Sequence, residues 1–185
     1  MRALLDVNVV IALLDPDHAF HERAHAWWAA QAKLGWASCP IVENGVVRTM
    51  SNPSYTQGAR FTPGDLISRL RAFATQTNHE FWPDDVSLRN GSLFTAERIH
   101  SSRQLTDLYL LALARKHAGK LATFDQSIPI SAVCGAKAES VCVIWIVKGH
   151  YTRVTQTVSR INRRPGRRLQ VFWRKLERLP TGGLL

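Results

Sequence analysis

Apolar and polar positions follow one another along the chain in blocks that predict a parallel sheet connected by helices. Short apolar runs of strand length alternate with segments whose apolar residues recur every three or four positions, the spacing of a helix. The predicted strands are 3–7, 36–39, 81–82, 120–124 and 140–147, and the predicted helices are 9–14, 18–33, 40–50, 63–77 and 105–117. This alternation is typical of α/β proteins, so we predict a three-layer α/β/α domain with a central parallel sheet of four or five strands.

Proline and glycine residues mark the predicted ends of several helices. Asp15-Pro16 ends the first helix, and Pro40 occupies the first turn of the third, where its missing N–H costs nothing. Gly119 follows helix 105–117 and is expected to cap it.

Composition and the length of the apolar runs favour a globular protein over a membrane-spanning or secreted one. Hydrophobic residues make up 45% of the 185 and charged residues 21%, as in a globular protein. The longest apolar run, Val141–Val147, is far shorter than the ~18 residues that a membrane span needs, and the N-terminus shows no signal-peptide cleavage site. The three cysteines form no C-x-x-C pair and are expected to be reduced thiols. Together these features predict a cytoplasmic protein without membrane contact.

Positive charge is concentrated at the C-terminus. The chain has a net charge of +10, and residues 148–185 hold ten basic residues and one acidic residue, a net of +9. We therefore predict a nearly neutral domain over 1–147 and a basic C-terminal extension over 148–185. Three roles for the extension are open: binding RNA phosphates, docking on a partner or an anionic membrane surface, or no selected role.

Four carboxylates stand at positions where an α/β sheet binds ligands. Asp6 follows the first strand, Asp125 follows strand 120–124, Asp107 lies in the first turn of helix 105–117, and Glu43 lies one turn into helix 40–50. Ligands of open parallel sheets bind outside the carboxyl ends of the strands, so these four acids are expected to meet at one edge. Any one of them alone would be an ordinary turn or helix-start residue.

Such a cluster predicts a divalent metal site. Like charges raise one another's pKa, and a bound cation removes the conflict. Oxygen ligands with retained waters suit Mg²⁺ or Mn²⁺, and an ion so held makes a bound water more acidic and polarises a phosphoryl group. Asn8 and Thr106 lie beside two of the acids, and Thr106 is expected to cap its helix. Arg48 is expected near the helix face of Glu43, where it either contacts a phosphate or forms a surface ion pair.

Four short motifs carry a resemblance to a known family: Leu4-Leu5-Asp6-Val7-Asn8, Glu43-Asn44-Gly45-Val46-Val47-Arg48, Thr106-Asp107-Leu108-Tyr109-Leu110-Leu111-Ala112 and Ala122-Thr123-Phe124-Asp125. In order and spacing they resemble the acidic motifs of PIN-domain ribonucleases, in particular VapC-type toxins of bacterial toxin–antitoxin modules. The resemblance covers about residues 1–147 and implies a PIN-like fold. The extension lies outside it.

The resemblance implies an Mg²⁺- or Mn²⁺-dependent endoribonuclease that cleaves structured RNA, often tRNA or rRNA. It further implies a homodimer and neutralisation by a VapB-type antitoxin. Carried over by position, Asp6, Glu43, Asp107 and Asp125 would be the catalytic and metal-binding residues. Asn8, Thr106 and Arg48 would contact the substrate.

Two other functions and one other site are compatible with parts of the sequence. Haloacid-dehalogenase phosphatases also carry an Asp after their first strand, but they need a second Asp two residues later, where this chain has Asn8. A catalytically inactive PIN-like module that binds RNA through the basic extension is the main alternative. His18, His21 and His25 share one predicted helix face, which could bind a transition metal, although exposed histidines without such a role are more common.

Overall fold

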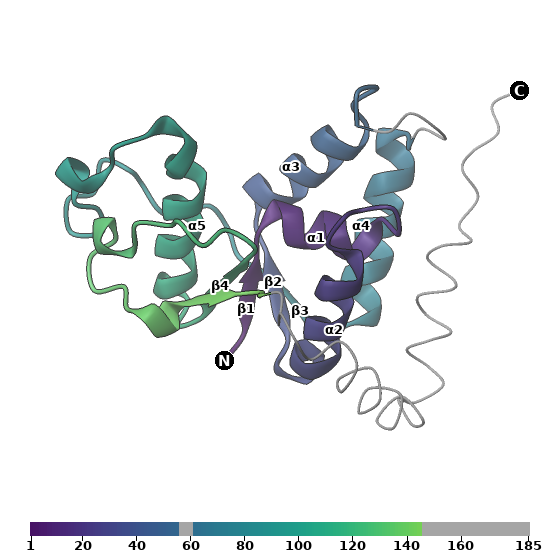
Figure 1. Ribbon diagram of the computed structural model, residues 1–185, viewed down its shortest axis with the longest axis horizontal. Helices are drawn as coiled ribbons and strands as arrows, with labels where there is room; N and C mark the ends of the chain where they lie inside the picture. Colours follow the sequence, from purple (N-terminus) through teal and green to yellow (C-terminus); the bar gives the residue numbers. More distant parts are fainter. Residues whose placement is uncertain (56–60, 146–185) are drawn as a thin grey trace, which may run out of the picture.

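The computed structural model describes residues 1–55 and 61–145 (Figure 1). The basic extension predicted over 148–185 and the last two residues of the predicted strand 140–147 lie outside this part of the chain.

Five parallel strands form the centre of the domain, in the spatial order β3-β2-β1-β4-β5. They are β1 (Ala3–Leu5), β2 (Trp36–Ser38), β3 (His79–Phe81), β4 (Lys120–Thr123) and β5 (Val141–Val143). The prediction of a parallel sheet is confirmed, with the larger of the two expected numbers of strands.

Helices cover both faces of the sheet, as Figure 1 shows. One face is covered by α1 (Val7–Leu14), α2 (His21–Gln31), α3 (Pro40–Met50) and α4 (Pro63–Gln76), and the other by α5 (Leu105–Lys116). Short 3₁₀ turns lie at Ala32–Leu34, Ala96–Arg98, Ser102–Gln104, Ile130–Ala132 and Ala138–Ser140. The three-layer α/β/α prediction is confirmed. In the described ranges no helix combines the length and the apolarity needed to cross a membrane.

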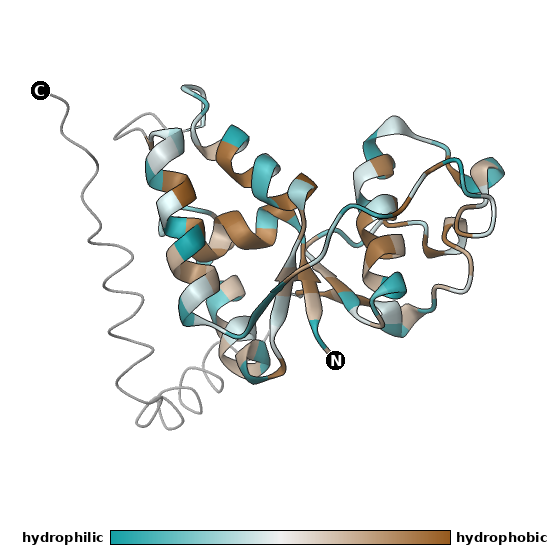
Figure 2. Ribbon diagram, turned by 180° about the vertical axis from the view of Figure 1, so that it is seen from behind, coloured by the Kyte–Doolittle hydropathy of each residue, from teal (hydrophilic) through white to brown (hydrophobic). Residues whose placement is uncertain are grey.

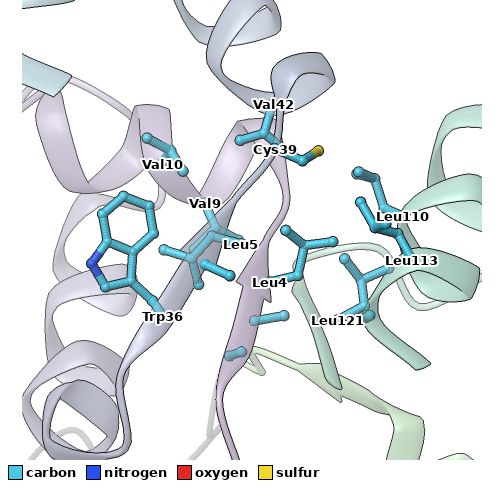
Figure 3. Packing of buried hydrophobic residues seen from close by; sticks show 14 of the residues in the cluster. Leu4, Leu5, Val9, Val10, Trp36, Cys39, Val42, Leu110, Leu113 and Leu121 are labelled. Carbon is cyan, nitrogen blue, oxygen red and sulfur yellow. The ribbon is translucent and has the colours of Figure 1, made fainter. Parts of the chain in front are cut away.

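The sheet is apolar on both faces because helices pack against both. In Figure 3, Leu4 points toward Leu110 and Leu113 of α5, while its neighbour Leu5 points toward Val9 of α1. Successive strand residues face opposite sides, so a strand covered on both faces must be apolar at every position. Figure 2 shows hydrophobic colour concentrated at the centre of the molecule, on the middle of the sheet and on parts of the helices beside it.

The third strand lies earlier in the chain than the sequence predicts, at His79–Phe81 instead of 81–82. Trp82 is buried and stacks on His117, with ring centroids 4.6 Å apart and planes 7° from parallel. Its apolar character therefore serves packing beneath the end of α5. The hydrophobic pattern of the sequence cannot distinguish a Trp that packs against a helix end from one that belongs to a strand.

The end of α5 is capped in a different way from the one expected. Ala118 adopts the left-handed conformation, with φ 53°, and Gly119 N–H donates to the carbonyl of Ala114 at 2.8 Å. This is the longer hydrogen bond of a Schellman motif, in which the residue before Gly119 makes the turn. Gly119 is needed for another reason: a Cβ there would lie 2.5 Å from the Trp82 ring.

Candidate active site

The carboxyl ends of β1 and β4 mark the point where the chain reverses its direction across the sheet. From β1 the chain passes through helices on one face to β2, whereas it reaches β4 from α5 on the other face. Such a switch point leaves a crevice that α/β proteins use for ligands. Asp6 directly follows β1, Asp125 lies two residues after β4, and Asp107 is in the first turn of α5.

Asp6 is the most enclosed of these acids, with only 7% of its surface exposed. Burial raises the pKa of its carboxyl group, and the nearby Asp125 carboxylate adds a smaller increase. The Thr123 hydroxyl donates to Asp6 Oδ2 at 3.0 Å and opposes these increases, as does the N–H of Val7. Two hydrogen-bond donors therefore stabilise the ionised form of Asp6, whereas the negative charge of Asp125 destabilises it.

Asp107 has the clearest perturbation in the cluster. Partial burial, then the charges of Asp6 and Asp125, raise its pKa to about 6. Within the described ranges none of the three aspartates forms an ion pair with a lysine, arginine or histidine. The site thus holds several acids whose mutual repulsion no basic side chain there offsets.

Thr123 connects the two strand ends. Its hydroxyl donates to Asp6 and accepts a hydrogen bond from the backbone N–H of Asp125 at 3.0 Å. The N–H and hydroxyl of Ser127 both donate to Asp125 Oδ1, each at 2.7 Å. These supporting groups were not identified from the sequence, although Thr123 stands in the fourth motif. A hydroxyl residue two positions before the acid was the available signal.

Glu43 belongs to a neighbouring hydrogen-bonded chain. Its Oε1 accepts from the Ser38 hydroxyl at 2.6 Å, and the same hydroxyl lies 2.8 Å from His79 Nε2. Since the single hydroxyl proton goes to Glu43, His79 Nε2–H is the donor to Ser38. Burial lowers the pKa of His79, and the Glu43 carboxylate partly offsets this. Sequence reasoning did not identify Ser38 or His79.

Gly45 lets α3 approach the start of α1. A Cβ at this position would lie 2.7 Å from Cγ2 of Val7, closer than side-chain carbons can be. Val7 directly follows Asp6, so this close contact holds the start of α1 against the second turn of α3, two residues after Glu43.

The three predicted supporting residues, Asn8, Thr106 and Arg48, lie on three different helices. Asn8 is exposed in the first turn of α1 beside Asp6, and Thr106 is exposed at the second position of α5. Thr106 is not the helix cap, because Gln104 is the N-cap residue and no side chain caps this end. Arg48 is exposed on α3 and forms no hydrogen bond or ion pair with the described residues.

Arg48 and Glu43 stand five residues apart on α3. Five residues along a helix amount to a rotation of about 140° beyond one full turn, so the two positions do not lie directly above one another. The structure brings three aspartates together and places Glu43 and Asn8 at the same sheet edge. A contact of Arg48 with a phosphate stays a prediction.

The histidines that could have formed another metal site serve the fold. His21 Nδ1 lies 2.9 Å from the carbonyl of Ala12, and His25 Nε2 lies 3.1 Å from that of Leu13. These are carbonyls of the last turn of α1, which a helix leaves without partners of its own. Burial, assisted by His21, lowers the pKa of His25 to about 4, so it is neutral at physiological pH.

The chemistry of the acidic cluster suits Mg²⁺ or Mn²⁺. In the part of the chain that the structure describes, no three His, Cys, Asp or Glu side chains lie close enough to form a ready-made metal group. A protein cage is not what these ions require, because Mg²⁺ commonly uses one or two carboxylates together with waters and substrate phosphates. Asp6 and Asp107, repelling each other at the switch point, fit that mode of binding.

Comparison with known protein families identifies the family to which this domain belongs. Residues 3–133 match the PIN domain, so the chain belongs to the PIN-domain family. Three ribonucleases of Mycobacterium tuberculosis are similar to it. VapC44 is 49% identical over 146 residues, which are 78% of this chain and 100% of that protein. VapC39 is 44% identical over 135 residues, covering 73% and 96%, and VapC38 is 40% identical over 126 residues, covering 68% and 86%.

Within the PIN family the chain is homologous to the VapC ribonuclease toxins of Mycobacterium. The resemblance carried by the four acidic motifs is thereby confirmed.

Proposed function

We propose that this protein is a toxin that cleaves RNA internally by metal-dependent hydrolysis, with tRNA or rRNA as the substrate. The observation that carries the proposal is the placement of Asp6, Asp107 and Asp125 together at the carboxyl ends of β1 and β4, without a basic partner among the described residues. Burial and the charges of Asp6 and Asp125 accordingly raise the pKa of Asp107 to about 6. A bound cation would neutralise the repulsion among these carboxylates, and it could then bind a phosphate of the RNA. The names of the similar VapC ribonucleases support the same activity.

The side chains would divide the work as follows. Asp6 and Asp107 would hold Mg²⁺ or Mn²⁺ between β1 and α5, with Asp125 and Glu43 completing the acidic pocket. A bound divalent ion supplies a more acidic water and a positive charge that faces the phosphate. Thr123 orients Asp6 through its hydrogen bond, and Ser127 holds Asp125. Asn8 and Thr106, exposed beside two of the acids, would contact the RNA.

We further propose that residues 1–147 form the catalytic domain, that it acts as a homodimer, and that a VapB-type antitoxin holds it inactive. The match to VapC44 over its full length supports the domain limits and the partner. Arg48 would contact RNA or the antitoxin from its own face of α3, away from the acidic cluster.

The test is cleavage of purified total RNA by the full chain, with Mg²⁺, with Mn²⁺ and with EDTA. Discrete fragments should form only when metal is present. Asp6→Asn keeps the size of the side chain and an acceptor for Thr123, and it should reduce the cleavage rate at least about 100-fold, since even residues that only support metal ligands are worth 10- to 100-fold.

Glu97→Gln is the matched control, because it removes one negative charge from an exposed residue of the 3₁₀ turn Ala96–Arg98. It should cleave at the wild-type rate. If Asp6→Asn cleaves as fast as Glu97→Gln, the proposed active site is wrong.

A further inference from the structure

A pocket of about 270 Å³ opens beside Asp125, on the β5 side of the acidic cluster. Its lining comes from β5 and from the connection between β4 and β5: Asp125, Gln126, Ile128, Ile130, Ala138, Val141, Val143 and Trp145. The walls are mostly apolar, and the two polar residues follow one another directly after Phe124. Asp125 belongs both to this pocket and to the acidic cluster, so the two sites are continuous.

Trp145 is the unusual member of this lining. Its side chain is 59% exposed, whereas Trp28, Trp36 and Trp82 are buried in the core. Val141, Val143 and Trp145 alternate along the chain with Ile144, which is itself buried. Since alternate residues of an extended chain face the same side, Trp145 continues the wall formed by the two valines.

The backbone at this position is held from the other side of the sheet. Arg23 of α2 donates to the carbonyl of Ile144 at 3.4 Å, and its guanidinium lies 4.3 Å from the centre of the Phe20 ring. This contact holds α2 against the backbone next to Trp145. Trp145 and Asp125 line the same pocket, so the exposed indole shares that pocket with one member of the acidic cluster.

We propose that this pocket receives one unstacked nucleobase of the RNA substrate, adjacent to the phosphate that is cleaved, with Trp145 as the stacking surface. The inference rests on the proposed ribonuclease function and names the part of the RNA that the site reads. The volume is just below the ~300–1,000 Å³ of pockets for drug-sized ligands, which suits a single base. Proteins bind single-stranded RNA by stacking its splayed bases on aromatic side chains.

The polar rim adds a means of selection. Gln126 carries an amide that both donates and accepts, as the edge of a base requires. Asp125 carries a negative charge, so a phosphate could not lie directly on it without a cation. The base would enter the apolar pocket while its phosphate lies toward Asp6 and Asp107. The cleaved RNA must then have an unpaired nucleotide at the cleavage site.

The test measures binding separately from cleavage, with the full chain. An Asp107→Asn background prevents cleavage, and the probes are short single-stranded oligoribonucleotides of random sequence and an abasic oligonucleotide of equal length. Adding Trp145→Ala should weaken binding of the base-bearing probe about 10-fold, the usual size of one base–aromatic stack. Trp145→Phe should retain most of the affinity. Neither change should alter binding of the abasic probe.

Salt and a second surface residue provide controls. The loss caused by Trp145→Ala should persist from about 0.1 M to about 0.5 M salt, because stacking, unlike phosphate contact, releases no counterions. Leu34→Ala removes a similarly exposed apolar side chain before β2, at the opposite edge of the sheet, and should change nothing.

Equal affinity of Trp145→Ala and its parent for the base-bearing probe would overturn the proposal, as would an equal loss on the abasic probe. If the pocket is instead filled by the protein's own chain, Trp145→Ala will lower the melting temperature and leave RNA affinity unchanged, which also overturns it. Failure of the ribonuclease proposal looks different: the wild type with Mg²⁺ or Mn²⁺ would then leave total RNA uncut.

Discussion

The two edges of the sheet use charge in opposite ways. At the amino edge, Arg2 donates to the carbonyls of Trp36 and Asn78 at 3.1 and 3.0 Å and pairs with Glu80 at 2.9 Å. At the carboxyl edge, Asp6, Asp107 and Asp125 repel one another and have no basic partner among the described residues.

The charges at the amino edge hold the strands together, whereas the charges at the carboxyl edge are suited to bind a ligand. Arg2 links the start of β1 to β2 and to the start of β3, and its charge is paired with that of Glu80 within the fold. The acids at the other edge lower the stability of the fold at neutral pH, a cost that proteins commonly carry at functional sites. Changing one residue at each edge should therefore have opposite effects on activity and stability.

The largest effect is expected from Asp107→Asn. The rate of RNA cleavage should fall at least about 100-fold, as for Asp6→Asn, because the proposed metal site would lose one of its two main ligands. The free energy of unfolding in EDTA at pH 7.5 should rise by on the order of 1 kcal/mol, because a partly buried charge beside two others is removed. Urea unfolding and RNA cleavage measure the two effects, with Glu97→Gln as the control for loss of charge. A variant that loses both activity and stability would contradict the contrast between the edges.

Thr123→Val should have the next largest effect. The change keeps the shape of the side chain but removes the donor to Asp6 and the acceptor for the N–H of Asp125. Activity or metal affinity should fall about 10- to 100-fold, the usual loss when a group that orients a metal ligand is removed. Metal titration of the cleavage rate measures this. Thr123→Ser keeps the hydroxyl and should recover most of the loss; equal defects in the two variants would exclude the hydrogen bond as the cause.

Arg2→Ala tests the amino edge. It removes the contacts to Trp36, Asn78 and Glu80 and should lower the free energy of unfolding by about 1–2 kcal/mol, the range of a few partly exposed hydrogen bonds. The metal-dependent rate of cleavage at 25 °C should stay within about twofold of wild type, because the residue lies at the far end of the strands. A large loss of activity in a folded variant would show that the edges are not independent.

The smallest effect is a dependence of stability on pH. The pKa of Asp107 is raised to about 6 in the folded protein, so the folded state binds this proton more tightly than the unfolded chain does. Its contribution to stability is complete below about pH 4 and is lost as pH rises through about 6. In EDTA, the free energy of unfolding of wild type relative to Asp107→Asn should therefore fall by on the order of 1 kcal/mol over this range. Added Mg²⁺ should reduce the difference if the proposed metal site is correct, since an ion that binds only the folded, deprotonated site stabilises it.

Much of the fold could be predicted because its signals are local. The start of α3 at Pro40 and the end of α1 at Asp15 follow from proline and its neighbours. The apolar run 3–5 is a strand that is covered on both faces, and the run 121–122 lies inside another buried strand, β4. Trp82 shows the limit, since an apolar residue at a strand end can also pack against a helix far along the chain.

The residues of the candidate site also fall into those that the sequence predicts and those that it does not. Asp6, Asp107 and Asp125 could be selected from the sequence because each follows a strand or begins a helix, and parallel strands end at a common edge. The links through Thr123 and the chain from His79 through Ser38 to Glu43 could not, because they join residues from different strands. The position of Arg48 relative to Glu43 depends on the helical rotation between them, which sequence distance alone does not express.

The sequence by itself determined most of the helices and strands, the positions of the acids along the chain and the family, since these depend on local pattern and on motifs that keep their order. The exact place of β3 was not among them. The tertiary structure alone decided the strand order β3-β2-β1-β4-β5, the shift of the Asp107 pKa and the pocket beside Trp145. Burial and charge–charge interaction act through space, so no property of Asp107 or Trp145 along the chain determines what surrounds it.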